Sequence, residues 1–279
     1  MNKDISNNAN TADKLKNAGI ENYIFEAKII EDHAKKYSLD NTARENMLIR
    51  RINREPLQYI LGEWEFYGDT YKLNNDCLIP RPETEFLTEY IINNAEHNSI
   101  ILDLCCGSGC ISISALKRRK DLTAVLVDIS QGAIDMANEN SESHGVCDRL
   151  QSHCLDIVRD FDKILSYSSN IGMIVSNPPY LTRAEVEQIK LEKTELYYEP
   201  EKAFFGGGDG LDFYRVIINN YSSKFFNAAT VLEAGINQCE DIIKMFERIN
   251  FSCETIRDYN KIERVIIGKY KKGVELMKL

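Results

Sequence analysis

Several features that mark secreted, membrane-bound or disordered proteins are missing from this sequence of 279 residues. It has no run of roughly 18 apolar residues, the length that a membrane-spanning helix requires. Residues 1–20 are polar and rich in asparagine, without the apolar segment of a signal peptide. With 43% hydrophobic and 28% charged residues, the composition is that of a soluble globular protein. We therefore expect a cytoplasmic protein without a membrane segment.

Metal sites and disulfide frameworks also lack the spacing that they need. The eight cysteines include no Cys-x-x-Cys pair, and the four histidines do not cluster with cysteines at zinc-site spacing. Eight cysteines are too few for a disulfide-rich scaffold of this length, and several lie in apolar segments. We expect no bound metal and free thiols in a reducing compartment.

Positive charge is scarce, since 34 Lys and Arg residues stand against 43 Asp and Glu, for a net charge of −9. The first 62 residues are close to neutral, so the acidity belongs to the rest of the chain. A protein that holds nucleic acid through its phosphates needs a basic surface. The charge therefore argues against stable nucleic-acid binding.

The first 79 residues predict a small helical domain followed by a hairpin. Two helices are predicted, over 20–37 and over about 41–54, the second capped by Asp40 or Asn41. The apolar positions of the first recur at helical spacing and are expected on one face: Tyr23, Ala27, Ile30, Ala34 and Tyr37. Residues 63–79 alternate around a Gly-Asp pair, which predicts a β-hairpin linker. This places a helical domain at 1–62, a linker at 63–79 and a larger domain at 80–279.

From residue 100 the pattern of strand, turn and helix repeats, which predicts an α/β fold with a doubly wound, mostly parallel sheet. Ligands of such sheets bind outside the carboxyl ends of the strands. Seven strands are expected, at 100–105, 124–128, about 151–155, 172–176, 230–233, about 251–257 and 264–270.

A glycine-containing turn follows the first of these strands. We expect it to bind a cofactor, through Asp103, Cys105, Gly107, Ser108, Gly109, Cys110 and Ile111. The glycines let a ligand approach the backbone closely. The third glycine of a dinucleotide fingerprint is replaced by Ser112, and a carboxylate at Asp103 is unfavourable beside phosphates. Both features count against a nicotinamide cofactor, the main rival, and favour a cationic ligand.

Asp128 ends the next strand and is expected to accept hydrogen bonds from ribose hydroxyls, with Ile129 beside it. Its alternative role is to cap the helix that follows. After the third strand, Asp156 and Ile157 are placed to border an adenine ring. A ribose, an adenine and a positive charge without phosphates together indicate S-adenosylmethionine.

The segment Asn177-Pro178-Pro179-Tyr180 follows the fourth strand and is the candidate catalytic loop. Two prolines fix the backbone and supply carbonyl acceptors without N–H donors. The Asn177 side-chain oxygen and the Pro178 carbonyl are suited to hold a planar NH₂ group, on which Tyr180 stacks. Such a site orients a weakly nucleophilic nitrogen at a methyl donor.

Seven segments together make the chain resemble the release factor glutamine methyltransferases. They are Pro56–Gly62, Ile79–Glu85, Gly107–Gly109, Asn177–Tyr180, Tyr198–Pro200, Gly207–Leu211 and Glu263–Val265. The resemblance implies a class I, Rossmann-like methyltransferase fold and transfer of a methyl group from S-adenosylmethionine. The acceptor in that family is the glutamine amide of the Gly-Gly-Gln motif in peptide chain release factors.

The resemblance also implies site residues and a partner. The loop Asn177, Pro178, Pro179 and Tyr180 would bind the glutamine of a release factor, which the helical domain helps to hold. Arg81 and Glu83 are expected to order this pocket, or else to shape a linker. Glu199 and Glu233 are expected either to line the site or to serve a structural role. The enzyme is expected to act as a monomer.

Three other functions share part of this pattern. A sibling enzyme methylates a glutamine of a large-subunit ribosomal protein, although the segment 81–85 resembles the release-factor group better. An adenine-amine methyltransferase acting on DNA or RNA fits the same two acceptors but wants a basic face. A non-catalytic binding protein on the same scaffold is expected to lack the glycine loop or Asn177, and both are present.

Overall fold

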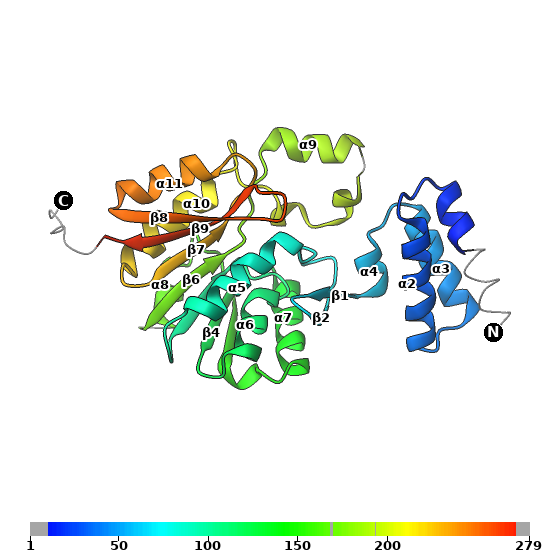
Figure 1. Ribbon diagram of the computed structural model, residues 1–279, viewed down its shortest axis with the longest axis horizontal. Helices are drawn as coiled ribbons and strands as arrows, with labels where there is room; N and C mark the ends of the chain where they lie inside the picture. Colours follow the sequence, from blue (N-terminus) through cyan, green and yellow to red (C-terminus); the bar gives the residue numbers. More distant parts are fainter. Residues whose placement is uncertain (1–10, 168–169, 193, 272–279) are drawn as a thin grey trace.

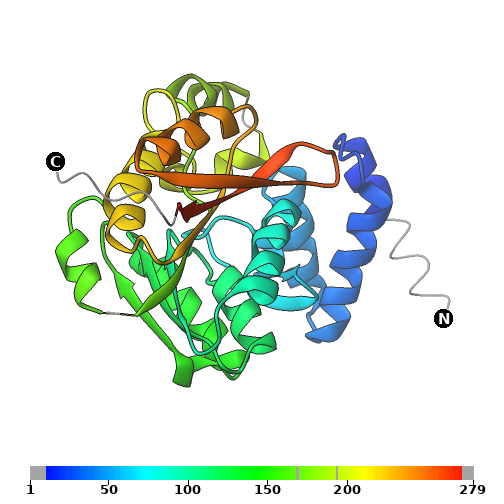
Figure 2. The same cartoon turned by 60° about the vertical axis from the view of Figure 1, so that its left-hand side comes forward.

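The computed structural model describes residues 11–167, 170–192 and 194–271, in which a helical part, a hairpin and a large sheet follow one another (Figure 1). The helical part contains α2 (Tyr23–Lys36), α3 (Asn41–Ile52) and α4 (Leu57–Leu61). In Figure 1 these helices stand to one side of the sheet and its covering helices, and after the turn in Figure 2 part of this region lies behind them. No helix among the described residues is long and apolar enough to cross a membrane.

The predicted helices are present, and their ends follow local chemistry. The Asp40 side chain accepts a hydrogen bond from the Ala43 backbone N–H (2.7 Å) and so caps α3. Ala27 and Ile30 are buried on the inner face of α2, as expected. Tyr37 is wrongly placed by the periodicity, because it lies past the end of α2 and its side chain is 47% exposed.

The hairpin of β1 (Glu63–Phe66) and β2 (Asp69–Lys72) joins the helical part to the sheet. Phe66 and Tyr71 are fully buried in the core beneath the sheet. The Tyr71 hydroxyl forms a hydrogen bond with Ser114 Oγ (2.6 Å). The hairpin is therefore anchored on the sheet side by both packing and a polar contact.

The sheet has seven strands in the order β5-β4-β3-β6-β7-β9-β8. All neighbours run parallel except at β9, which is antiparallel to both β7 and β8, so the predicted mostly parallel sheet is confirmed. The strands are β3 (Ile100–Leu104), β4 (Thr123–Asp128), β5 (Leu150–Cys154), β6 (Ile171–Ser176), β7 (Ala229–Glu233), β8 (Phe251–Arg257) and β9 (Glu263–Tyr270).

Helices cover both faces of the sheet, because alternate side chains of the central strands point to opposite sides. One face packs against α5 (Glu85–Asn94), α6 (Cys110–Arg118) and α7 (Gln131–Ser143). The other packs against α8 (Phe161–Ser166), α10 (Asp212–Val216), the π-helix at Ile217–Ser222 and α11 (Cys239–Arg248). Helix α9 (Arg183–Glu192) and three 3₁₀ turns (Pro82–Thr84, Glu195–Tyr198 and Glu201–Ala203) lie in the connections. A further 3₁₀ turn at Cys147–Arg149 precedes β5.

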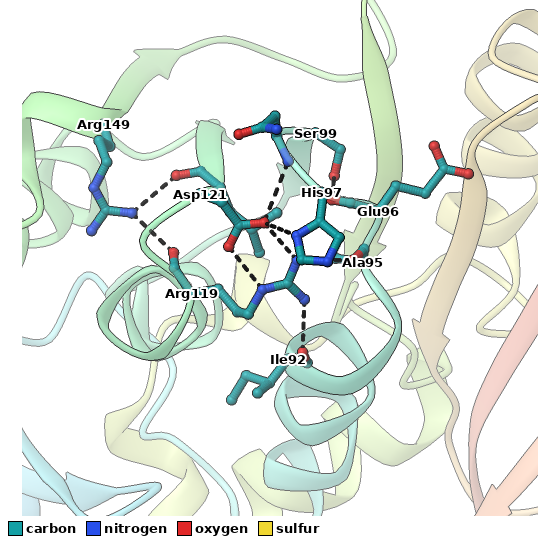
Figure 3. Close-up of polar contacts among 10 residues, drawn as sticks. Ile92, Ala95, Glu96, His97, Ser99, Arg119, Asp121 and Arg149 are labelled. Atoms are coloured by element: carbon teal, nitrogen blue, oxygen red, sulfur yellow. Dashed lines mark hydrogen bonds and ion pairs between the residues drawn. The ribbon is translucent and has the colours of Figure 1, made fainter.

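Two arginines fasten the helix ends on the α5–α6 side (Figure 3). Arg119 donates to the carbonyls of Ile92 and Ala95 at the end of α5 and pairs with Asp121. Arg149 donates to three carbonyls around the end of α6, at 2.9 to 3.1 Å. Carbonyls at a helix C-terminus lack partners within the helix, so these cations satisfy groups that would otherwise be lost.

A buried arginine connects the helical part to the loop after β6. Arg51 is 3% exposed and pairs with Glu26 on α2 and with Glu195 in the 194–203 segment. The Tyr198 hydroxyl donates to the Asn53 carbonyl beside it. These contacts fix the helical part against a segment that borders the site described next.

Candidate active site

A cavity of about 540 Å³ opens at the carboxyl ends of β3, β4, β5 and β6. This is the position at which doubly wound sheets bind ligands. Its wall includes four acidic side chains, Asp76, Asp128, Asp156 and Glu201, against two basic ones, Arg81 and Lys202. The excess of carboxylates favours a cationic ligand over one that carries a pyrophosphate.

The turn after β3 forms the floor of this cavity. Cys105 has a φ of +60°, a strained conformation for a residue with a side chain that costs on the order of 1–3 kcal/mol. At Gly107 (φ +53°) a Cβ would meet no atom within 4 Å, so this glycine leaves open space for a ligand. At Gly109 a Cβ would lie 2.9 Å from Ile113 and 3.1 Å from Ala137, so this glycine lets α6 and α7 approach.

Asp128 is tied to the glycine turn by backbone hydrogen bonds. One carboxylate oxygen accepts from the Gly107 N–H and the other from the Ser130 N–H, both at 2.9 Å. Burial raises the pKa of Asp128, while these two N–H groups lower it. Each oxygen keeps a second lone pair, so Asp128 can accept two more hydrogen bonds. The predicted alternative was that Asp128 caps α7. The Asp128 carboxylate accepts from Ser130, the residue before α7, and within the described part of the chain it makes no hydrogen bond with an N–H of the helix itself.

Asn177 directly follows the last residue of β6, at the edge of the sheet where the cavity opens. Ser176 Oγ donates to the Leu104 carbonyl (2.6 Å), which holds the ends of β6 and β3 together. The Asn177 Nδ2 donates to Thr84 Oγ1 (3.2 Å), whereas Asn177 Oδ1 is buried without a partner among the described residues. A buried acceptor without a partner is costly, which marks Oδ1 as a binding atom.

A second cavity of about 230 Å³ meets the first at Asn177, Arg81, Leu78 and Ala203. Most of its wall is apolar: Leu78, Tyr180, Leu181, Leu196, Ala203 and Phe204. Burial raises the pKa of Tyr180 to about 12, so its hydroxyl is neutral. Two compartments that share Asn177 can hold two ligands with their reacting atoms close together.

The Asn177–Tyr180 loop is clamped from behind. Gln238 Nε2 donates to the carbonyls of Tyr180 (3.0 Å) and Gly210 (3.3 Å). A Cβ on Gly210 would lie 2.3 Å from the Tyr180 carbonyl oxygen, so only glycine allows this approach. Leu181 exchanges backbone hydrogen bonds with Phe204 and Gly206. The loop therefore presents Asn177 from a rigid support.

Arg81 is aimed into both cavities by a buried carboxylate. Glu199 accepts from Arg81 (2.6 Å) and from the Ile79 backbone N–H (3.0 Å). Burial raises the pKa of Glu199, and Arg81 opposes this. The Glu199 side chain lines neither cavity, and its contacts with Arg81 and the Ile79 backbone favour the structural one of its two predicted roles.

Most predicted site residues meet at these cavities. The walls include Cys105, Gly107, Ser108, Cys110, Ile111, Asp128, Ile129, Asp156, Ile157, Asn177, Pro179, Tyr180 and Arg81. Neither cavity is lined by the other predicted site residues, which are Asp103, Gly109, Pro178, Glu83 and Glu199.

Asp103 lies under the glycine turn instead of in the cavity wall. It is fully buried, with one oxygen accepting from Ser112 Oγ (2.6 Å) and the other without a partner among the described residues. Burial raises its pKa to about 7. Residues alternate along β3, so Leu102 and Leu104 face one side of the sheet while Asp103 points towards α6.

The sequence reasoning missed several wall residues, among them Asp76, Thr84, Lys202, Phe205 and Phe213. Thr84 lies inside the segment 79–85, in which Arg81 and Glu83 were predicted as site residues. No local signal marks Lys202 or Phe213, because only folding brings them to the strand ends. Within the described residues, no group of three His, Cys, Asp or Glu side chains is arranged to hold a metal ion.

This chain resembles known proteins in sequence and in fold. Residues 82–199 match the methyltransferase small domain family. The release factor glutamine methyltransferase of Geobacter sulfurreducens is 39% identical over 226 residues, covering 80% of this chain and 76% of that protein. The enzyme of the same name from Fusobacterium nucleatum is 35% identical over 275 residues, covering 91% and 75%. The solved hMettl16 catalytic domain in complex with MAT2A 3′UTR hairpin 6 has a TM-score of 0.55 at 13% identity, covering 82% of this chain and 84% of that chain, which shows the fold alone.

Proposed function

Because this chain belongs to the release factor glutamine methyltransferase family, we propose that it methylates peptide chain release factors. The methyl group passes from S-adenosylmethionine to the side-chain amide nitrogen of the glutamine in the Gly-Gly-Gln motif. One observation supports this function above the others. The unpartnered Asn177 Oδ1 stands where the two cavities meet, as an acceptor for a substrate N–H.

The larger cavity fits the cofactor. Its acidic wall suits a cationic sulfonium, and Gly107 leaves the space that close approach to the backbone requires. Asp128 has lone pairs free for two ribose hydroxyls, while Ile129, Asp156 and Ile157 supply the wall for adenine. When bound, S-adenosylmethionine supplies an electrophilic methyl group. Asp103 and Gly109 support the turn from beneath.

The smaller cavity fits the glutamine side chain. An amide nitrogen is a poor nucleophile, because its lone pair is delocalised into the carbonyl. Asn177 Oδ1 accepts one of its N–H bonds and so fixes the direction in which the nitrogen faces. The Pro178 carbonyl is the predicted second acceptor, although Pro178 lines neither cavity. Asn177 Oδ1 binds more strongly as positive charge develops on the nitrogen. Tyr180 and the apolar wall exclude water from this position.

The helical part of the chain is assigned to substrate recognition. We take residues 1–62 as a domain that helps to hold the release factor, 63–79 as a linker and 80–279 as the methyltransferase domain. The Arg51 contacts support this, since they hold the helical part beside the 194–203 segment that reaches both cavities. We place the enzyme in the cytoplasm, where translation ends, and expect a monomer that binds no nucleic acid stably.

One competition experiment tests the proposed substrate. The full chain is incubated with labelled S-adenosylmethionine and a mixture of release factor, large-subunit ribosomal proteins and DNA. Mass spectrometry then locates the label. Label on the Gly-Gly-Gln glutamine is expected, with none in a parallel sample of the Asn177→Ala variant. Label on a ribosomal protein or on DNA alone would overturn the assignment.

A further inference from the structure

A chain of three side chains connects the substrate acceptor to a buried carboxylate. Asn177 Nδ2 donates to Thr84 Oγ1 at 3.2 Å, and Thr84 Oγ1 donates to Glu233 Oε2 at 2.6 Å. Thr84 is 3% exposed and Glu233 is 2% exposed. These residues come from the turn before α5, the end of β6 and the end of β7, and the two strands are neighbours in the sheet (Figure 1).

The hydrogen-bond directions along this chain are not interchangeable. A hydroxyl has one hydrogen, and Thr84 spends it on Glu233, so towards Asn177 it can only accept. The NH₂ group of Asn177 must therefore face Thr84, and the amide oxygen must face away from it. An amide side chain has nearly the same shape in both orientations, so its hydrogen bonds alone decide which atom points where.

We propose that Thr84 and Glu233 are positioning residues that fix the amide of Asn177 with its oxygen towards the substrate. This inference rests on the proposed function, since it concerns how the same site recognises an amide NH₂. With the amide reversed, Asn177 would present a donor to the glutamine N–H groups and repel them. It would instead suit an acceptor such as a glutamate carboxylate, so the pair also sets the preference for glutamine.

The structure excludes two simpler roles for these residues. Glu233 lines neither cavity, and its hydrogen bond goes to Thr84, so it is separated from Asn177 by that hydroxyl. Thr84 is the residue before α5, yet its side chain makes no cap hydrogen bond with that helix. Removal of the hydroxyl therefore costs no helix cap.

The protonation state of Glu233 decides the direction of the hydrogen bonds from Glu233 through Thr84 to Asn177. When ionised, it accepts from Thr84. When protonated, it can donate to Thr84 Oγ1, which frees the Thr84 hydrogen to point at the Asn177 oxygen. Burial raises the pKa of Glu233 to about 7. The other groups that act on it are Arg264 on β9, Tyr214 on α10, Tyr180, Cys110 at the start of α6, and Arg81 and Glu83 before α5.

The decisive comparison uses Thr84→Val, which keeps the shape but loses the hydroxyl, with Thr84→Ser as its matched control. Binding of a Gly-Gly-Gln peptide and of a Gly-Gly-Glu peptide is measured for each. In Thr84→Val we expect the preference for glutamine over glutamate to fall about tenfold or more, and Thr84→Ser to restore it. A merely structural defect would weaken both peptides equally, and an unchanged preference would overturn the proposal.

Kinetics give an independent reading. Methylation by Thr84→Val should fall by about 10- to 100-fold in kcat/KM for the peptide, and Thr84→Ser should restore it. In wild type, kcat/KM should decline as the pH falls below about 7, and Glu233→Gln should flatten this decline. An equal decline in Glu233→Gln would contradict the positioning role of Glu233. If Thr84→Val does not fold, the pH profile of Glu233→Gln tests the proposal in its place.

Failure of this inference is distinguishable from failure of the proposed function. Wild-type enzyme that does not methylate a release factor disproves the function. Wild-type enzyme that is active, together with a Thr84→Val variant of unchanged preference, disproves the positioning role alone. Thermal melting of every variant separates both outcomes from loss of the fold.

Discussion

Replacement of Asp128 by Asn tests the cofactor site most directly, because it keeps the shape of the side chain. In wild type, the two carboxylate oxygens accept one hydrogen bond each from Gly107 and Ser130, both at 2.9 Å. An Asn has only one oxygen, so its NH₂ group must face one of these two N–H donors. The substitution therefore removes a negative charge and one loop contact, and it leaves fewer lone pairs for ribose hydroxyls.

The expected loss follows from the hydrogen bonds that disappear. A hydrogen bond to a charged group contributes about 1.5–3 kcal/mol. Loss of one such bond to the cofactor raises the dissociation constant by about 10- to 150-fold. The contact between the Asn NH₂ group and the N–H donor of Gly107 or Ser130 adds to this loss, because both residues form part of the cavity wall.

Titration calorimetry with S-adenosylmethionine measures this effect without any protein substrate. Asp135→Asn on the exposed side of α7 is the control, because it removes the same charge without touching the cavity. We expect its dissociation constant to stay within about twofold of wild type. A dissociation constant within threefold of wild type in Asp128→Asn, with a normal melting temperature, would refute the ribose role.

Three further substitutions test separate parts of the molecule. Asn177→Ala should lower methyl transfer by about 100-fold or more, with near-normal calorimetric affinity for S-adenosylmethionine; activity within a few-fold of wild type would contradict the acceptor role. Burial raises the pKa of Asp103 from 3.8 to about 7. The free energy of unfolding therefore falls as the pH rises between these values, because the unfolded chain ionises this carboxyl more readily than the native protein does. Asp103→Asn should therefore stabilise the protein at pH 8 relative to pH 4, by about 4 kcal/mol at most in urea unfolding; equal effects at both values would disprove this. Arg149→Met, which leaves three carbonyls without their donor, should cost about 1–3 kcal/mol in urea unfolding and spare cofactor affinity.

Local sequence features led to the correct fold and to much of the site. All seven predicted strands are present. Most of them are apolar runs bounded by turns, whereas the segments 151–155 and 251–257 are largely polar and were placed by their position in the repeating pattern. Gly107, Asp128 and Asn177 were each found at the end of such a strand. Parallel strands bring their carboxyl ends to one edge, so three separate motifs predicted one site.

Burial and orientation were harder to predict. Asp103 was expected at the ligand, but in β3 it faces α6, and Tyr37 was expected on the buried face of α2 but lies beyond its end. Asp103 lies inside the strand predicted at 100–105 and its direction follows from the alternation of side chains along β3, whereas the misplacement of Tyr37 arose at the end of an element. There, a shift of one residue turns a side chain to another face, and spacing alone does not fix the boundary.

The sequence by itself determined which chemistry is present: a glycine turn with an acidic partner, and a rigid Asn-Pro-Pro-Tyr loop with its acceptors. Only the tertiary structure decided how that chemistry is aimed. Thr84 lies 93 residues from Asn177 and 149 residues from Glu233, yet the three form one hydrogen-bonded chain. Their contact exists because β6 and β7 are neighbours and the turn before α5 packs across their ends. A hydrogen bond needs its atoms within about 3 Å, and sequence spacing carries no information about such distances between remote segments.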